Sequence, residues 1–191
     1  MLRVLLLVVA LAVAACSGPE RPQFKSTDIT GADYAKDFSL TDHNGQPRHL
    51  ADFRGKVVTV FFGYTQCPDV CPTSLAGMAE VMRLLGSDAA RLQVLFITVD
   101  PERDTRELLA QYVPAFNPSF LGLYGDPATT AAVAKDFKVF YRKVGEGPNY
   151  TVDHSAGTFV FDPAGRARLY VKHGESPAVI AEDIKLLLAG K

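Results

Sequence analysis

Strongly apolar runs and amphipathic stretches alternate along the chain. Residues 57–62 (VVTVFF) and 92–99 (LQVLFITV) are continuous β-branched and aromatic runs, which are typical of strands buried on both faces. Between them, residues 72–85 carry apolar side chains at helical spacing and end before Gly86, a common helix stop. This pattern predicts a strand–helix–strand crossover and therefore two parallel strands.

Caps and turns mark the other elements. Asn44-Gly45 predicts a small hairpin at the start of the domain. The later elements are a helix capped by Asp104 or Thr105 and running through residue 113, a helix from Pro127 to residue 137 capped by Asp126, a hairpin of residues 158–162 and 166–171, and a last helix after Ser176. This order of elements predicts an α/β domain with a thioredoxin-like fold, in which helices flank a central mixed sheet.

The composition is that of one globular domain. The chain has 191 residues, of which 48% are hydrophobic and 21% charged, and its formal net charge is −1. These values exclude disordered, collagen-like and coiled-coil proteins. The chain has no basic run, so it lacks the electrostatic footprint of a nucleic-acid-binding protein, and we expect no nucleic-acid partner.

The N-terminus has the features of an export signal. Arg3 precedes an apolar stretch that is too short for a permanent membrane span. The small residues before Cys16 resemble the lipobox of bacterial lipoproteins, which are cleaved before the Cys and acylated on it. We therefore expect a lipoprotein signal peptide at residues 1–15, a lipid on Cys16, a flexible tether at residues 16–36 and the folded domain at residues 37–191.

Export also decides the compartment. The mature chain is expected in the bacterial cell envelope, attached to a membrane by its lipid, with the domain facing the periplasm or the exterior. An uncleaved anchor, and a cut nearby that leaves Cys16 as a free thiol, are the alternatives. With Cys16 lipidated, Cys67 and Cys71 are the two thiols left. A pair this close in sequence adds little stability as a structural disulfide, so it needs a chemical explanation.

Cys67 and Cys71 form a C-x3-C motif directly after the first central strand. In open α/β sheets, ligands bind at the carboxyl ends of the strands. Pro72 disfavours an α conformation at Cys71, so the sequence places Cys71 at the cap of the next helix, where a helix N-terminus lowers thiol pKa values. Such a pair either forms a disulfide or holds a soft metal, and the spacing does not choose between the two.

Three motifs in order, GYTQCPDVCPTSLAGM, VDPERDT and VDHSAGTFVFD, resemble the SCO/SenC family over about residues 36–188. Members of that family are thioredoxin-fold copper-binding factors for cytochrome c oxidase assembly. The resemblance implies that Cys67, Cys71 and His154 bind copper, one Cu(I) or Cu(II) per chain. The chemistry agrees, because two thiolates and an imidazole select copper or zinc rather than magnesium or calcium.

The function expected from this resemblance is that of a copper chaperone rather than an enzyme. It would deliver copper to the dinuclear copper site of a cytochrome c oxidase subunit, and an upstream periplasmic copper carrier is a candidate source of that copper. The alternative is a thiol–disulfide oxidoreductase that keeps the copper-site cysteines of the oxidase reduced, with Cys67 and Cys71 as its redox-active pair. Ala156-Gly157 stands where thioredoxin-like redox enzymes have a cis-Pro, which argues against a general redox role.

Two further functions are less favoured. A peroxidase needs an arginine beside a reactive cysteine, and Arg54, Arg91 and Arg103 all lie outside the Cys loop in sequence. A structural zinc site is disfavoured because three ligands leave the coordination shell of zinc open.

Several other polar or sulfur-containing residues have ordinary structural explanations. We expect solvent-facing histidines, core methionines, and a structured turn with a helix cap in the VDPERDT motif. Asp69 is not expected to be a ligand, whereas Asp153 is a candidate for a hydrogen bond to the metal-site loop. The histidines concerned are His43, His49 and His173, and the methionines are Met78 and Met82.

Overall fold

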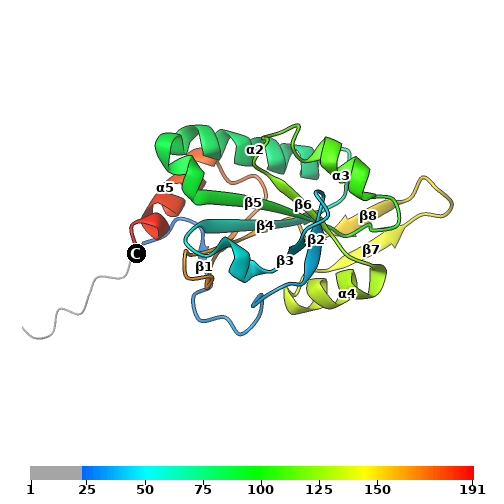
Figure 1. Ribbon diagram of the computed structural model, residues 1–191, viewed down its shortest axis with the longest axis horizontal. Coiled ribbons are helices and arrows are strands. Elements are labelled where there is room, and N and C mark those ends of the chain that lie inside the picture. The colour runs from blue at the N-terminus through cyan, green and yellow to red at the C-terminus, as the bar shows by residue number, and fades with distance from the viewer. Residues whose placement is uncertain (1–22) are drawn as a thin grey trace, which may run out of the picture.

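A parallel pair of buried strands forms the centre of the molecule. The computed structural model describes residues 23–191, so the expected signal peptide and the lipid on Cys16 lie outside the described residues (Figure 1). Strands β4 (Val57–Gly63) and β5 (Leu92–Thr98) are buried along their whole length and pair in parallel. Helix α2 (Val70–Leu85) connects them, which confirms the predicted crossover.

An eight-stranded mixed sheet extends from this pair in both directions. β9 (Thr158–Phe161) lies antiparallel to β4, and β6 (Leu121–Tyr124) lies parallel to β5. The full order is β1-β10-β9-β4-β5-β6-β2-β3. The remaining strands are β1 (Thr27–Asp28), β2 (Leu40–Asp42), β3 (Pro47–Arg48) and β10 (Ala167–Val171). The predicted α/β class and central mixed sheet are confirmed.

Helices cover both faces of the sheet (Figure 1). α2 packs beside α5 (Pro177–Leu188), and α4 (Pro127–Asp136) lies on the opposite side of the sheet. α3 (Arg106–Tyr112) packs against β6, and short 3-10 helices occupy Leu50–Phe53 and Gly86–Arg91. Within residues 23–191, no helix combines the length and the apolarity needed to cross a membrane.

The two faces of β4 pack against different helices because side chains alternate along a strand. Gly63 lies on the face toward α2, where a side chain at this position would meet both Cys71 and the ring of Phe61. Phe62 points to the other side and packs on Phe137 at the end of α4, with ring centroids 5.2 Å apart. The carboxyl end of β4 is therefore fixed from both sides, and the loop that follows it begins from a rigid position.

The predicted caps are present. Thr105, rather than Asp104, caps α3 by accepting a hydrogen bond from the Leu108 amide at 3.3 Å. Asp126 caps α4 and Ser176 caps α5 in the same way, each followed by proline in the first helical turn. Proline is favourable there because the first N–H groups of a helix have no helical partner.

The packed domain begins earlier than the sequence predicts. The amides of Lys25 and Ser26 donate hydrogen bonds to the Asp183 carboxylate of α5 at 2.9 and 2.8 Å. β1 pairs with β10, and Ala35 is buried. Residues 25–36, which the sequence assigns to the flexible tether, are therefore part of the domain. Their polar composition does not indicate this, because backbone hydrogen bonds rather than a pattern of apolar side chains attach them to the domain.

A second, two-stranded sheet was not predicted from the sequence. β7 (Tyr141–Val144) and β8 (Thr151–His154) form an antiparallel hairpin that extends from the body of the molecule (Figure 1). Most of its side chains are at least partly exposed, with Val152 as a buried exception. Its apolar alternation is consequently too weak to mark it as a strand pair.

Candidate metal centre

The two cysteines lie where β4 passes into α2. Cys67 is in the loop and partly exposed, whereas Cys71 is in the first turn of α2 and fully buried. α2 begins at Val70, after Asp69, so Cys71 lies inside the helix and not at its cap as the sequence predicts. Pro72 fits in this first turn for the same reason that proline suits the starts of α4 and α5.

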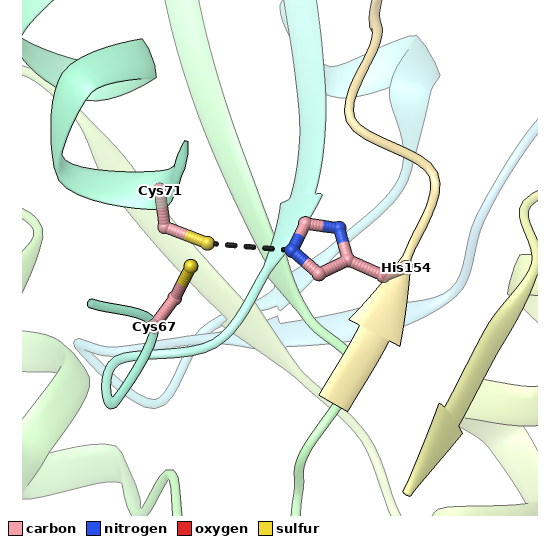
Figure 2. Close-up of side chains that lie close together, drawn as sticks. All are labelled: Cys67, Cys71 and His154. Atoms are coloured by element: carbon pink, nitrogen blue, oxygen red, sulfur yellow. Dashed lines mark hydrogen bonds between the residues drawn. The ribbon is translucent and has the colours of Figure 1, made fainter. Parts of the chain in front are cut away.

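His154 reaches the cysteines from the end of β8 (Figure 2). Its Nε2 atom is 3.6 Å from Cys71 Sγ, across a sequence separation of 83 residues. The two sulfur atoms and a ring nitrogen of His154 all lie within 4.8 Å of one another. The structure thus brings together the three residues implied by the family resemblance. His154 occupies a strand end, whereas the sequence placed it in a loop.

One hydrogen bond fixes the proton on the His154 ring. Nδ1 lies 2.9 Å from the carbonyl oxygen of Ser155. A carbonyl only accepts, so Nδ1 carries the hydrogen and Nε2 presents a lone pair toward Cys71. Burial lowers the pKa of His154, and the Ser155 contact and the charge of Asp153 oppose this only partly. The imidazole is therefore held in the neutral form and tautomer that bind a metal.

Two aromatic rings hold the imidazole from its sides. The ring centroids of Phe61 and Tyr64 lie 6.0 and 5.9 Å from that of His154, and both meet it edge to face. Phe61 is on β4 and Tyr64 follows it, so the strand that leads to the cysteines also packs against the histidine. These contacts limit rotation of the ring and exclude water from part of the site.

The pKa of the Cys71 thiol is shifted in the opposite direction from the one predicted. Burial raises the pKa of the Cys71 thiol, and the neighbouring Cys67 adds to the effect. Desolvation outweighs the helix N-terminus, because the charged thiolate loses its hydration in this position. Without a metal, Cys71 is a protonated thiol, and it must release that proton when a metal binds.

The donor set fits copper. Soft thiolates together with an imidazole are ligands that copper prefers. The 3.6 Å between Cys71 Sγ and His154 Nε2 is short enough for one metal ion to bind both atoms. Within residues 23–191, no fourth His, Cys, Asp or Glu joins the group, which disfavours structural zinc.

Asp104 fixes the start of the Cys loop. It is almost fully buried and accepts hydrogen bonds from the Thr65 amide at 3.0 Å and the Thr65 hydroxyl at 2.6 Å. The hydroxyl of Thr98, at the end of β5, donates to the same carboxylate at 2.6 Å. Burial raises the pKa of Asp104, although the hydrogen bonds from Thr65 and Thr98 oppose the shift. The loop is thereby attached to the neighbouring central strand.

The other acidic candidates lie outside the ligand group. Asp69 is exposed and precedes α2, where its carbonyl accepts hydrogen bonds from Thr73. Asp153 is also exposed and pairs with Arg142 on the neighbouring strand at 3.2 Å. Among residues 23–191, the group of possible metal ligands therefore includes neither of these two carboxylates.

Among the remaining histidines, one expectation is wrong. His49 and His173 are exposed, as predicted. His43 is buried, and its Nδ1 accepts a hydrogen bond from the Gly122 amide at 3.0 Å. This hydrogen bond attaches the turn between β2 and β3 to β6. Met78 and Met82 pack in or against the core, as predicted.

Of the three arginines considered for peroxidase chemistry, the fold places Arg103 beside the Cys loop. Its Nη1 donates to Gln66 Oε1 at 3.0 Å, while its Nε is bonded to Asp100. The sequence predicts a structured turn and a helix cap for this segment, and it does not identify Arg103 and Asp104 as neighbours of the site. The signal was present, because both residues belong to one of the three family-like motifs.

The sequence of this chain is similar to those of known proteins. A sequence profile of the SCO1/SenC family matches residues 26–189. The SCO2-like protein of Rickettsia felis is 37% identical over 87% of this chain and 84% of its own length. The mitochondrial SCO2 homologue of Mus musculus is 41% identical over 80% of this chain, and the match spans 62% of the mouse protein.

Comparison with a solved structure shows that the similarity extends to the fold. The chain resembles the copper-bound structure of ScoI from Bradyrhizobium japonicum with a TM-score of 0.73 and 42% sequence identity. The match covers 80% of this chain and 98% of that structure. The similarity therefore extends over nearly the whole of that structure.

Proposed function

This chain belongs to the SCO1/SenC family, and from that membership we propose that it is a copper chaperone. It binds one copper ion, as Cu(I) or Cu(II), through Cys67, Cys71 and His154. It delivers this copper to the dinuclear copper site of a cytochrome c oxidase subunit while the oxidase is assembled.

The observation that carries this proposal is the convergence of the three donors. Two sulfurs and a neutral imidazole from segments far apart in sequence lie within 4.8 Å of one another. The ScoI structure that this chain resembles is described as copper-bound. Copper is the cargo of the protein, so the site has to release it as well as hold it.

The exposure of the site suits transfer. Cys67 is partly exposed, whereas Cys71 is buried beneath it. An acceptor thiolate therefore approaches from the Cys67 side and takes copper through a shared intermediate, while Cys71 and His154 retain it until exchange is complete. Three ligands leave the metal an open position for the incoming group.

The proposal includes a place in the cell. The apolar N-terminal stretch before Cys16 supports a lipoprotein that is anchored in the bacterial envelope with its domain facing the periplasm or the exterior. Cys16→Ser should then release the protein from membranes on fractionation, whereas unchanged retention would indicate an uncleaved anchor.

A second candidate function rests on the same two sulfurs. Cys67 and Cys71 are free thiols, so they can reduce a disulfide of the acceptor. Cys67 would attack one acceptor sulfur, Cys71 would resolve the mixed disulfide, and the products would be an acceptor dithiol and a Cys67–Cys71 disulfide. This reaction would prepare the oxidase cysteines for copper without moving the metal.

Metal content and thiol titration of the full chain in mild detergent separate the two functions. The reduced protein is loaded with Cu(I) and, separately, with Cu(II). One copper per chain, a sulfur-to-copper absorption band for Cu(II), and loss of both in Cys67→Ser support the chaperone. A readily reduced Cys67–Cys71 disulfide without stable copper binding would support the reductase instead.

A further inference from the structure

Arg103 connects the hairpin that carries His154 to the loop that carries Cys67. Its Nη1 donates hydrogen bonds to the backbone carbonyls of Tyr150 at 2.8 Å and Pro148 at 3.3 Å, both in the β7–β8 connection. The same nitrogen lies 3.0 Å from Gln66 Oε1, next to Cys67 in sequence. One guanidinium therefore contacts both the loop that carries Cys67 and the hairpin that carries His154.

Arg103 is itself firmly held. Its Nε donates to one oxygen of Asp100, and the Tyr150 hydroxyl donates to the other. The guanidinium also lies over the Tyr150 ring, with its carbon 3.5 Å from the ring centroid. The Asp100 and Arg103 side chains are 1% and 13% exposed, so separating the pair would leave a charge largely buried and unpaired.

The hairpin needs such an attachment. Its two strands form a separate sheet, and an isolated two-stranded hairpin is only marginally stable in water. β7 faces solvent over most of its length. Val152 anchors the middle of β8 in the core, and Tyr150 packs against the core at the end of the β7–β8 connection. Arg103 adds hydrogen bonds to the backbone of this connection and joins it to the Cys loop through Gln66.

We propose that Arg103 is a positioning residue of the copper site. It holds the β7–β8 hairpin against the Cys loop, and so it keeps His154 within bonding reach of the metal held by Cys67 and Cys71. The proposal rests on the proposed function only in naming copper, because the hydrogen bonds that hold the hairpin do not depend on a metal. Arg103 touches no metal in this role and acts through His154.

The test compares Arg103→Lys and Arg103→Met with Arg142→Met in the full chain, in mild detergent. Lysine keeps a positive charge beside Asp100 and so preserves folding, but one ammonium group cannot reproduce the planar fork of arginine. Arg142 is the matched control, because it lies on the same hairpin and its exposed pair with Asp153 stays within that hairpin.

The first readout needs no copper. Hydrogen exchange of the amides in residues 141–154 should be faster in both Arg103 variants than in the wild type, with exchange in β4 and α2 unchanged. Arg142→Met should leave hairpin exchange at the wild-type rate. If Arg103→Met fails to fold, Arg103→Lys decides the result by itself.

The second readout is the copper site. In Arg103→Lys, the nitrogen hyperfine signal of His154 in the Cu(II) spectrum should weaken, and copper affinity should fall about 10- to 100-fold, as is typical when a group that orients a ligand is lost. The proposal would be overturned if Arg103→Lys showed the same hydrogen exchange in the hairpin and the same nitrogen hyperfine signal as Arg142→Met. A wild-type protein that binds no copper would refute the proposed function, while hydrogen exchange would still decide the role of Arg103.

Discussion

The sulfur of Cys71 occupies the space that a side chain on Gly63 would need. A Cβ at residue 63 would lie 2.7 Å from Cys71 Sγ and 2.8 Å from the ring of Phe96. Both neighbours are buried, so neither can move away cheaply. The absence of a side chain at the end of β4 is thus a condition for the position of the buried cysteine.

Gly63→Ala should therefore damage both the fold and the metal site. We expect a loss of about 1–3 kcal/mol in the free energy of unfolding, and weaker copper binding because Cys71 is displaced from His154. Urea unfolding and copper competition titrations measure the two effects. Gly77→Ala in α2 is the control, since a Cβ there meets no atom within 4 Å, and it should stabilise the helix by up to about 1 kcal/mol. Equal behaviour of the two variants would contradict the steric role of Gly63.

His154→Ala should weaken copper binding without abolishing it, because both thiolates remain. The loss should exceed the about 10- to 100-fold typical of orienting groups, since a ligand itself is removed. The nitrogen contribution to the Cu(II) electron paramagnetic resonance spectrum should disappear. His173→Ala is the matched control on an exposed histidine. A Cu(II) spectrum unchanged by His154→Ala would exclude His154 as the third ligand.

The two thiols should differ in reactivity. Cys71 is fully buried and its thiol pKa is raised by that burial, whereas Cys67 is partly exposed. Iodoacetamide should therefore alkylate Cys67 well before Cys71 in the reduced, metal-free protein. Peptide mass spectrometry after timed quenching measures the order. Bound Cu(I) should protect Cys67, and faster modification of Cys71 would refute the assigned burial.

His43 should make stability depend on pH. Burial lowers its pKa below the ordinary value of 6.5, and the charge of Asp42 opposes this only partly. The folded state therefore binds the proton less well than the unfolded chain. The stability contributed by neutral His43 is fully present above about pH 6.5, and it is lost as the pH falls from there through the lower pKa of the folded state.

His43→Ala tests this contribution. Above the unfolded pKa it should cost about 1–3 kcal/mol, because the buried amide of Gly122 loses its acceptor. The difference from the wild type should shrink on acidification, as followed by urea unfolding at several pH values. Copper binding should remain unchanged, since His43 lies outside the donor group. A difference that does not vary with pH would show that His43 does not titrate with folding.

The sequence alone determined the parts of the structure that depend on local pattern. The runs at residues 57–62 and 92–99 correspond to β4 and β5, because strands covered on both faces need continuous apolar residues. Asp126 and Ser176 identified two helix starts, because a cap acts within one turn. The family-like motifs also pointed to Cys67, Cys71 and His154, whose ligand atoms the structure places within 4.8 Å of one another.

Only the tertiary structure decided the relationships between distant segments. It placed His154 at 3.6 Å from Cys71 and Arg103 between the hairpin and the Cys loop. It also buries His43, which the sequence predicts to be exposed, and Cys71, whose thiol pKa is raised by burial rather than lowered. Such features follow from strand order and from the packing of elements on both sides of the sheet. They therefore depend on contacts between residues far apart in sequence, which no local periodicity encodes.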